Sequence, residues 1–400
     1  MQDAVKLTFL GDIMCKAEML PAFENAGEGY CFDSLFAQMK PLFKTADYVF
    51  ANLETPISFD DLDLTGEQFC FNSPCEFAEA VKMAGIDFVA TANNHCLDRG
   101  VDGITSTIRS LEKIGLAHTG VFSSREKKPL IVDVQGIKIG IMSYTYGTNA
   151  FSNHNYLPFR EYWRVNLFQN QELSNRFTRE IEKRKGGIPW RVYHKLMRMF
   201  YPINETRRVY ERREFSLRCK YHLRREIRDM KQQSPDFIVM YMHAGGQYNP
   251  EATEDTKNLA EYLIRNGVNV VVGTHEHVVH GGDFSQFEIG ALATYSLGNF
   301  DGIAGVYAEP FDKMAEYSIA WHIYVDRIEK RITKTSFSVL KTVRDGEESM
   351  KIKTVPVFDL YQSLDGNEKE KLFQDTVEIA RRFAGMDVSA LPLQEEYSLQ

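Results

Sequence analysis

Seven short apolar runs, each closed by polar residues, recur along the chain and alternate with stretches of helical periodicity. The runs are VKLTFLGD, YVFANLE, DFVATANNH, IKIGIMSYTYGTN, DFIVMYMHAGG, VNVVVGTHEH and ALATYSLGN. Between them, VDGITSTIRSLEKIG and EDTKNLAEYLIRNG repeat apolar residues at helical spacing and end in Gly, a common helix stop. This alternation of strands and helices predicts an α/β fold in which helices pack on sheets.

The composition is that of a folded globular protein with one large, elaborated domain. The 400 residues are 44% apolar and 26% charged, which argues against wholesale disorder and against a fibrous repeat. We expect the α/β domain to occupy residues 1–345, interrupted by a basic helical insertion at 151–234. Residues 346–400 contain NEKEKLFQDTVEIARRFAGM and are expected to form a C-terminal helical extension.

The polar residues that close these runs form a candidate site. In an α/β fold the carboxyl ends of the strands line one rim, and ligands bind there. The chemically active residues at these ends are Asp12, Glu54, Asn94, His95, His243, His275 and His277. Each residue also has an alternative, purely structural interpretation. Asp12 could be a helix N-cap, Glu54 and Asn94 could be turn residues, and each histidine could be a structural imidazole. Their joint placement at strand ends favours a common site.

The sequence GTHEH has ligand spacing. In an extended backbone, His275 and His277 point to the same side and Glu276 points away. His280 has the opposite parity, so we expect it to be structural. Carboxylates, an amide and imidazoles together suit Mn, Fe or Zn, and no thiolate is needed.

The cysteines and the N-terminus bear on the compartment. The six cysteines form no CxxC pair, which favours reduced thiols. The start, MQDAVKLTFLGDIMCK, has no signal-peptide pattern, and no apolar run is long enough to span a membrane. We expect a cytoplasmic protein or one peripheral to a membrane.

A basic segment is set in an acidic chain. Residues 160–231 contain 20 Lys and Arg against 9 Asp and Glu, although the net charge of the whole chain is −8. The simpler interpretation is a helical insertion whose basic residues face the solvent. The alternative is a platform for an anionic polymer or an anionic membrane surface. No nucleic-acid-binding motif accompanies the basic residues, so we expect no nucleic acid partner.

Several motifs carry a family resemblance. The segments GDIM, ANLETP, ATANNHCLDRG, LEKIGLAHTG, SYTYGTN, GTHEHV and YSLGNF occur in order. They resemble the CapA-type capsule synthesis proteins, the poly-γ-glutamate capsule group of the calcineurin-like metallophosphoesterase superfamily. The resemblance covers roughly residues 5–150 and 235–302. It implies a four-layer α/β/β/α sandwich with two divalent metal ions at one rim.

The resemblance also implies roles for individual residues. Asp12 and His277 would bind the first metal ion, and Glu54 would bridge the two ions, with Asn52 as its competitor. The second ion would take the remaining ligands, which are Asn94, His243 and His275. His95 would assist at the leaving group. Independently of the resemblance, we expect Asp98, three residues on, to orient the second ring nitrogen of His95, as carboxylates do for histidines beside metal ions.

Two departures from the family pattern stand out. Met14 occupies a position where many metallophosphoesterases have a histidine, and Gln247 replaces a family acid. The leading hypothesis is a metal-dependent hydrolase that acts on a phosphoester or a γ-glutamyl amide. The alternative is a non-catalytic factor that binds an anionic capsule polymer during its assembly or export.

Overall fold

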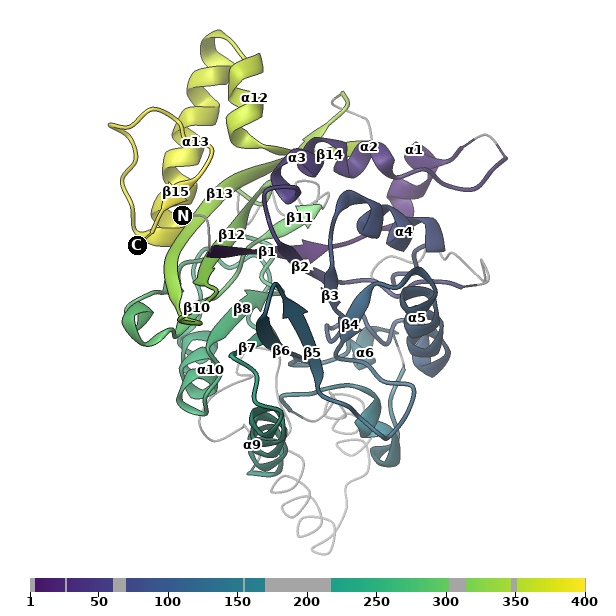
Figure 1. The fold of residues 1–400 in the computed structure, drawn as a ribbon. Coiled ribbons are helices and arrows are strands. Elements are labelled where there is room, and N and C mark those ends of the chain that lie inside the picture. Colours follow the sequence, from purple (N-terminus) through teal and green to yellow (C-terminus); the bar gives the residue numbers. More distant parts are fainter. Residues whose placement is uncertain are drawn as a thin grey trace, which may run out of the picture.

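Two β-sheets stack face to face, with helices on their outer sides (Figure 1). The computed structural model describes residues 4–25, 27–59, 70–153, 155–169, 217–301, 314–346 and 351–399. The order of layers is helix, sheet, sheet, helix. This confirms the predicted α/β/β/α sandwich.

The larger sheet has β1 at its centre, where parallel and antiparallel pairing meet. Its strands run in the order β14 (Ile352–Pro356), β13 (Ile332–Arg344), β12 (Tyr317–Asp326), β1 (Ala4–Ile13), β2 (Tyr48–Leu53), β3 (Phe88–Ala90) and β4 (Ala117–Thr119). β1 pairs in parallel with β2 and antiparallel with β12. Two further short strands belong to this sheet. β11 (Asn299–Asp301) pairs with β1, and β15 (Tyr397–Ser398) pairs with β13.

The smaller sheet is parallel through its middle. Its order is β5 (Leu130–Val134), β6 (Ile137–Thr145), β7 (Phe237–His243), β8 (Val270–Thr274), β10 (Leu292–Thr294) and β9 (Gly282–Asp283). β6, β7, β8 and β10 are parallel, whereas β5 and β9 run antiparallel at the two edges. The central strands therefore share one carboxyl-terminal rim.

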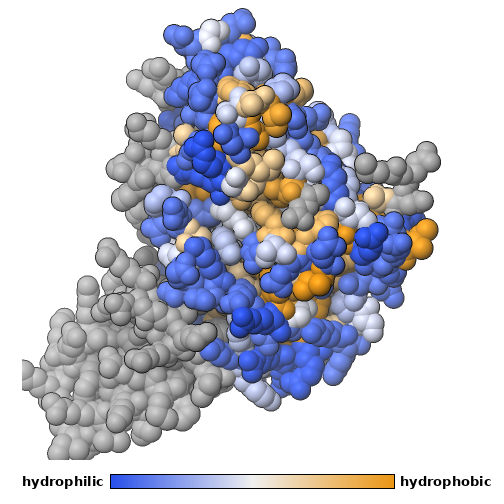
Figure 2. Space-filling model, turned by 90° about the vertical axis from the view of Figure 1, so that its left-hand side faces the viewer, coloured by the Kyte–Doolittle hydropathy of each residue, from blue (hydrophilic) through white to orange (hydrophobic). Residues whose placement is uncertain are grey.

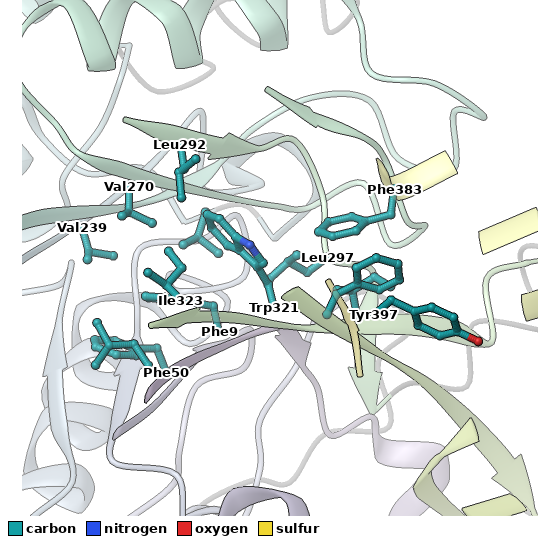
Figure 3. Packing of buried hydrophobic residues seen from close by; sticks show 14 of the residues in the cluster. Phe9, Phe50, Val239, Val270, Leu292, Leu297, Trp321, Ile323, Phe383 and Tyr397 are labelled. Atoms are coloured by element: carbon teal, nitrogen blue, oxygen red, sulfur yellow. The ribbon is translucent and has the colours of Figure 1, made fainter. Parts of the chain in front are cut away.

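The main core lies between the two sheets, and strand periodicity explains it. Phe9 and Phe50 point inward from the larger sheet and meet Val239 and Val270 from the smaller one (Figure 3). Neighbouring residues on the same strands, such as Leu10, point to the outer faces. Because side chains alternate along a strand, apolar residues at both parities require cover on both faces.

Helices provide that cover. The outer face of the larger sheet packs against α1 (Leu20–Phe23), α2 (Asp33–Phe36), α3 (Lys40–Phe43) and α4 (Cys75–Ala84). The outer face of the smaller sheet packs against α9 (Leu217–Gln232) and α10 (Glu254–Arg265). The remaining helices are α5 (Gly100–Ile114), α6 (Ala150–Asn153), α12 (Val357–Ser363) and α13 (Gly366–Ala384).

The two helices predicted from periodicity are present. In α5 the buried residues Ile104, Ile108 and Leu111 recur at helical spacing, and Gly115 ends the helix at a φ of 66°. α10 starts where the Thr253 side chain accepts a hydrogen bond from Thr256 N. It is capped at its carboxyl end by Asn266, one residue earlier than the Gly that we expected to end it.

The C-terminal residues belong to the domain, which differs from the boundary expected at residue 345. β14 pairs with β13 over five residue pairs, and β15 pairs with the same strand. Leu372 and Phe383 of α13 pack into the core between the sheets. The expectation of a helical extension missed these strands because they are short and lack the polar closing residues of the other runs.

The expected insertion at 151–234 is described only at its two ends. The carboxyl-terminal end of this expected insertion is α9, a core helix. Its residues Leu223, Ile227 and Met230 pack on the smaller sheet. Residues 170–216 lie outside the described residues. In the part of the chain that is described, no helix is long and apolar enough to cross a membrane. On the face drawn in Figure 2 most residues are hydrophilic, with hydrophobic ones gathered near the middle.

Candidate metal centre

The candidate site lies where strands from both sheets end. Asp12 is inside β1, one residue before its end, which excludes the helix N-cap interpretation. A Cβ on Gly11 would stand 1.9 Å from the carbonyl oxygen of Gly298, so only glycine fits here. This close approach lets Gly298 accept a hydrogen bond from Asp12 N, at 3.1 Å, and fixes the carboxylate at the rim.

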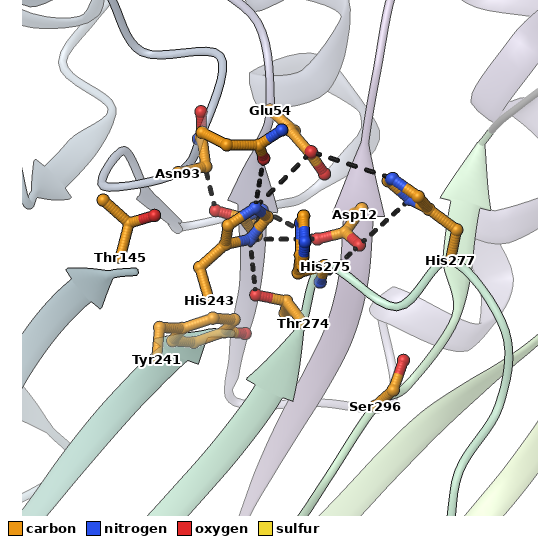
Figure 4. A network of polar contacts seen from close by, with 12 residues as sticks. Asp12, Glu54, Asn93, Thr145, Tyr241, His243, Thr274, His275, His277 and Ser296 are labelled. Carbon is orange, nitrogen blue, oxygen red and sulfur yellow. Dashed lines mark hydrogen bonds and ion pairs between the residues drawn. The ribbon is translucent and has the colours of Figure 1, made fainter. Parts of the chain in front are cut away.

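Three imidazoles and two carboxylates converge in this buried site (Figure 4). One group of potential ligand atoms comes from Asp12, Glu54 and His243, and a second from Glu54, His275 and His277, with the atoms of each group within 4.8 Å of one another. Glu54 belongs to both groups. Glu54 can therefore be shared between two ions, but these groups pair Asp12 with His243 and His275 with His277, whereas the family resemblance pairs Asp12 with His277 and His243 with His275.

The two rim histidines reach the site by a different backbone from the one expected. β8 ends at Thr274, and His275 and His277 follow in a bend with φ values of 94° and 62°. The extended spacing was therefore the wrong reason for their convergence. Their ring centroids still lie 5.9 Å apart, and His275 N donates to Asp12 Oδ2 at 3.0 Å. Such left-handed backbone is strained for residues other than Gly and is concentrated at functional sites.

The two asparagines differ in what they offer. Asn94 Oδ1 lies 2.6 Å from His243 Nε2, so both atoms face the same point. Asn52 instead turns its amide nitrogen toward the cluster and donates to Asp12 Oδ1 at 2.7 Å. This favours Glu54 over Asn52 as the shared ligand, and it makes Asn52 a residue that orients Asp12.

Sequence reasoning missed several residues that hold the ligands in place. Thr274 Oγ1 lies 2.9 Å from His243 Nδ1, and Asn299 Oδ1 lies 2.8 Å from His277 Nδ1. Asn93 Nδ2 donates to the carbonyl of Leu53 at 2.7 Å and ties two rim loops together. Asn299 follows the run ALATYSLG, so the strand-end rule applied to that run would have found it.

Burial dominates the electrostatics of the two carboxylates. It raises the pKa of Asp12 to about 8, with the neighbouring Glu54 as the second cause, although His243 and the bond from Asn52 oppose the shift. Burial also raises the pKa of Glu54, against the opposing effect of His277. A cation at the site would reverse both shifts, because it favours the charged carboxylates.

The imidazoles are shifted toward their neutral forms. Burial lowers the pKa of His243 to about 3 and that of His277 to about 4, and it moves the pKa of His275 well below its usual value. A neutral imidazole carries the lone pair that a metal ion needs. The environment of all three rings is therefore compatible with ligation.

Unpartnered buried atoms test whether these residues fit a metal ion. Among the described residues, no group donates a hydrogen bond to either oxygen of Glu54, and His275 Nδ1 has no partner. Buried polar atoms without partners are costly and rare in folded proteins. Atoms of this kind beside Asp12 and His243 form an oxygen and nitrogen donor set that suits Mn, Fe or Zn. The residues fit the group.

His95 lies beside the cluster with a fixed orientation. Its Nδ1 is 2.6 Å from Asp98 Oδ2, and the ring stacks on Phe71 at a centroid distance of 3.9 Å. Asp98 is itself held by Phe71 N at 2.7 Å and by Asn153 Nδ2 at 3.0 Å. Burial lowers the pKa of His95, but the Asp98 carboxylate outweighs it and the net shift is upward.

Met14 and Gln247, the two residues that depart from the family pattern, lie in different environments. Met14 is buried, and its backbone N donates to Asp301 Oδ1 at 2.6 Å. Gln247 is exposed, yet its Nε2 reaches to 3.3 Å from His277 Nε2. Asp301, which sequence reasoning did not consider, lies at the end of β11 beside β1.

Glu276 and His280 lie behind the site. A Cβ on Gly245 would stand 1.8 Å from Glu276 Oε1, so the Glu276 carboxyl packs against that glycine and away from the cluster. His280 Nε2 is 2.7 Å from the carbonyl oxygen of Asn249. Both contacts are with the loop after β7, as expected if His280 has a structural role.

Two named relatives are both capsule proteins. The chain is 22% identical over 302 residues to the PGA biosynthesis protein CapA of Bacillus subtilis, covering 74% of this chain and 63% of that one. It is 23% identical over 303 residues to the capsule biosynthesis protein CapA of Bacillus anthracis, covering 74% and 60%. The chain thus spans about three fifths of the length of these curated relatives.

A solved structure, described as a novel phosphatase of Mycoplasma pneumoniae, aligns with a TM-score of 0.39 and 15% identity, covering 84% of this chain and 93% of that one. The family model described as "Bacterial capsule synthesis protein PGA_cap" matches residues 6–302, the part of the chain that carries every residue of the candidate metal centre. The chain belongs to this family of bacterial capsule synthesis proteins.

Proposed function

We propose that this protein is a metal-dependent hydrolase that acts on a phosphoester or a γ-glutamyl amide during synthesis of a capsule polymer such as poly-γ-glutamate. The observation that carries the proposal is the buried donor set around Glu54, whose oxygens receive no hydrogen bond from the described residues. A structural polar cluster would pair these atoms internally. Atoms left facing one another are instead suited to bind cations.

Each residue has a place in this scheme. Asp12 and His277 would hold the first ion, and Asn94, His243 and His275 the second, with Glu54 shared. When bound, two divalent cations would stabilise negative charge that develops on a phosphorus or carbonyl centre and would help water to attack it. Two carboxylates offset only part of their charge, so the site would favour an anionic substrate.

His95 would supply the proton to the leaving group. Asp98 accepts a hydrogen bond from Nδ1, so Nε2 is the nitrogen that faces the reaction. Nε2 lies 3.4 Å from Asn149 Nδ2, at the end of the loop after β6. Phe71 stacks on the ring and prevents it from tilting. In the imidazolium form, which the raised pKa of His95 favours, Nε2 would give its proton to the leaving oxygen or nitrogen.

The direct test is turnover of a phosphodiester and γ-glutamyl peptide panel with Mn, Fe or Zn supplied. We expect His95→Asn to lower kcat by about 10²–10⁴-fold, the range for general acid catalysis, while the metal content stays nearly intact. His118→Asn is a matched control, because His118 lies on β4 and bonds to the carbonyl of Leu116 outside the cluster. Loss of metal together with activity would make His95 a ligand. No turnover by the wild type would contradict the hydrolase proposal.

One observation favours a second, non-catalytic function. A cleft of about 680 Å³ is lined by α9, by Arg125 and Lys127 ahead of β5, by Tyr144 of β6 and by residues between 160 and 169, and its charged lining is mainly basic. It includes Arg125, Lys127, Arg160 and Arg225 against a single carboxylate, Glu226. Tyr144 and Trp163 add aromatic surface to its wall. This chemistry suits an anionic chain, and the protein would then act as an assembly or export factor for the polymer.

Salt dependence tests the second function. We expect affinity for poly-γ-glutamate to fall steeply with salt, because screening shortens the reach of exposed charges to about 8 Å at physiological ionic strength. Arg125→Ala with Arg160→Ala should weaken binding further at low salt, because both line the cleft. Arg331→Ala, on the exposed β12–β13 turn, is the control. Binding of anionic vesicles but not of the polymer would point to a membrane surface. If neither binds at low salt, the basic residues form only a solvent-exposed face without an anionic partner.

A further inference from the structure

The two halves of the metal centre are unequal. At the second position, His243 Nε2 lies 2.6 Å from Asn94 Oδ1 and 3.5 Å from Glu54 Oε1, so these atoms are already gathered, with a hydrogen bond between His243 and Asn94 that an ion would replace. At the first position, His277 Nε2 is 3.9 Å from Glu54 Oε1. Met14 adds no imidazole at this position. The first position therefore has fewer donors, and they are less well gathered.

The hydrogen bonds of His277 define which of its nitrogens is available. Asn299 Oδ1, an acceptor, lies 2.8 Å from His277 Nδ1, so Nδ1 carries the proton and Nε2 carries the lone pair. Gln247 Nε2 lies 3.3 Å from that same Nε2 and donates an N–H to it. The amide of Gln247 thus occupies the lone pair that the first metal ion would need.

The backbone beneath Gln247 is held firmly by the segment that carries His277. Tyr248 N donates to the carbonyl of Glu276 at 2.8 Å, and His280 Nε2 donates to the carbonyl of Asn249 at 2.7 Å. Gly245 packs on the Glu276 side chain. Gln247 itself is exposed to solvent. Its side chain can leave His277 without any change in the loop.

We propose that Gln247 gates the first metal position by capping the lone pair of His277 until an ion displaces it. The inference rests on the metal centre of the proposed function and concerns its regulation. At the second position, among the described residues, no N–H caps His243 Nε2, which instead faces the acceptor Asn94 Oδ1 at 2.6 Å. The two ions therefore meet different competitors and bind in separate steps. The first position is the weaker one, and its occupancy sets the fraction of active protein.

Binding of Mn²⁺ to the metal-stripped 400-residue chain tests the gate without any activity measurement. Gln247→Met keeps the length of the side chain but has no N–H to donate. We expect it to tighten the weaker binding step about 2- to 10-fold, the equivalent of one hydrogen bond, and to leave the tighter step unchanged. Gln38→Met, at an exposed position in the 3₁₀ turn Ala37–Met39, is the matched control and should change neither step.

The outcomes separate this inference from the proposed function. Two binding steps in the wild type that Gln247→Met leaves unaltered would overturn the gate alone. Weaker binding in Gln247→Met would also overturn it, because Gln247 would then be a ligand through its oxygen. A wild-type chain that binds no Mn²⁺ would overturn both proposals. Circular dichroism and the Tm without metal identify any variant that has failed to fold.

Discussion

Two polar clusters lie along the same strand, β1, one of them partly exposed around Glu396 and the other fully buried around Asp12, and they differ in how their atoms are paired. Toward the amino end, Thr8 Oγ1 lies 2.9 Å from His322 Nδ1, and His322 Nε2 lies 3.1 Å from Ser338 Oγ. Nearby, the Glu396 carboxylate accepts hydrogen bonds from four donors, which are Lys6, Tyr324, Lys334 and Ser336. At this end of β1 each of these groups has a partner.

Toward the carboxyl end, the cluster around Asp12 is incomplete. Asp12 is well bonded, by Asn52 Nδ2 at 2.7 Å and by His275 N at 3.0 Å. Glu54 receives no hydrogen bond from the described residues, and His275 Nδ1 has no partner there.

The difference separates a polar cluster that is paired within the fold from one that has the donor atoms to bind a ligand. Burying a polar group is costly unless it is paired, so a cluster that has only a structural role pairs most of its atoms. The buried Thr8, His322 and Ser338 follow this rule. The half-buried Glu396 beside them, next to β15, has four donors and helps to anchor that strand to β13. The cluster around Glu54 departs from it and leaves donor atoms that could hold a cation.

Metal ions should give the largest effect, because they complete only one of the two clusters. We expect Mn²⁺ at 100 to 1,000 times its Kd to raise the free energy of unfolding by about 3–4 kcal/mol. EDTA should reverse the change, and Glu396→Gln should show the same increment as the wild type. Unfolding curves with and without metal measure it. No metal-dependent change in the wild type would remove the contrast between the clusters.

The second-largest change in the free energy of unfolding is expected from removing the Glu396 carboxylate. Glu396→Gln should lower the free energy of unfolding at pH 7 by about 1–3 kcal/mol, because charge-assisted bonds are lost and their donors left unpaired. Burial raises the pKa of Glu396, but the bonds from Lys334 and Ser336 outweigh it and hold this pKa well below its ordinary value of 4.5.

The sign of the pH dependence follows from that depressed pKa. Stability from Glu396 is fully present above pH 4.5 and is lost as the pH falls below it, because only the unfolded state then binds the proton readily. The difference between wild type and Glu396→Gln should therefore shrink from pH 5 to pH 3. Urea unfolding across this range measures it. A difference that stays constant would mean that the charge of Glu396 is not what stabilises the strand.

The smallest effect is expected in the opposite direction. Glu54→Gln should raise the free energy of unfolding of the metal-free protein by about 1 kcal/mol, because it removes a buried carboxylate that no group donates to. Burial raises the pKa of Glu54, so its stability at low pH is lost as the pH rises above 4.5. The gain in the variant should thus be larger at pH 8 than at pH 5. A destabilised variant would show that Glu54 has a structural partner.

Much of the fold and the membership of the site could be predicted from the sequence. Runs such as VNVVVGTHEH show both a buried strand and the polar residues that follow it, and parallel strands bring such residues to one rim. This is why Asp12, Glu54, His243 and His275 were found together. Periodicity also placed α5 within one residue.

The rest depended on tertiary contacts that no local pattern carries. The left-handed bend at His275 and His277 exists because β8 ends early and the chain turns across β1. The pairing of β14 and β15 with β13 joins residues far from the earlier runs. The contact of Gln247 with His277 links two loops 30 positions apart, so its geometry was not visible from either motif.

The most direct measurement of the central claim is the metal content of the purified chain and of the double variant His275→Ala with His277→Ala. Elemental analysis after equilibration with Mn, Fe or Zn should find up to two divalent ions per wild-type chain. The double variant should lose most of them, because each histidine contributes to the buried group that shares Glu54. His322→Ala, which alters the fully paired cluster, should keep the wild-type content. Equal metal content in the wild type and the His275/His277 double variant would contradict the account.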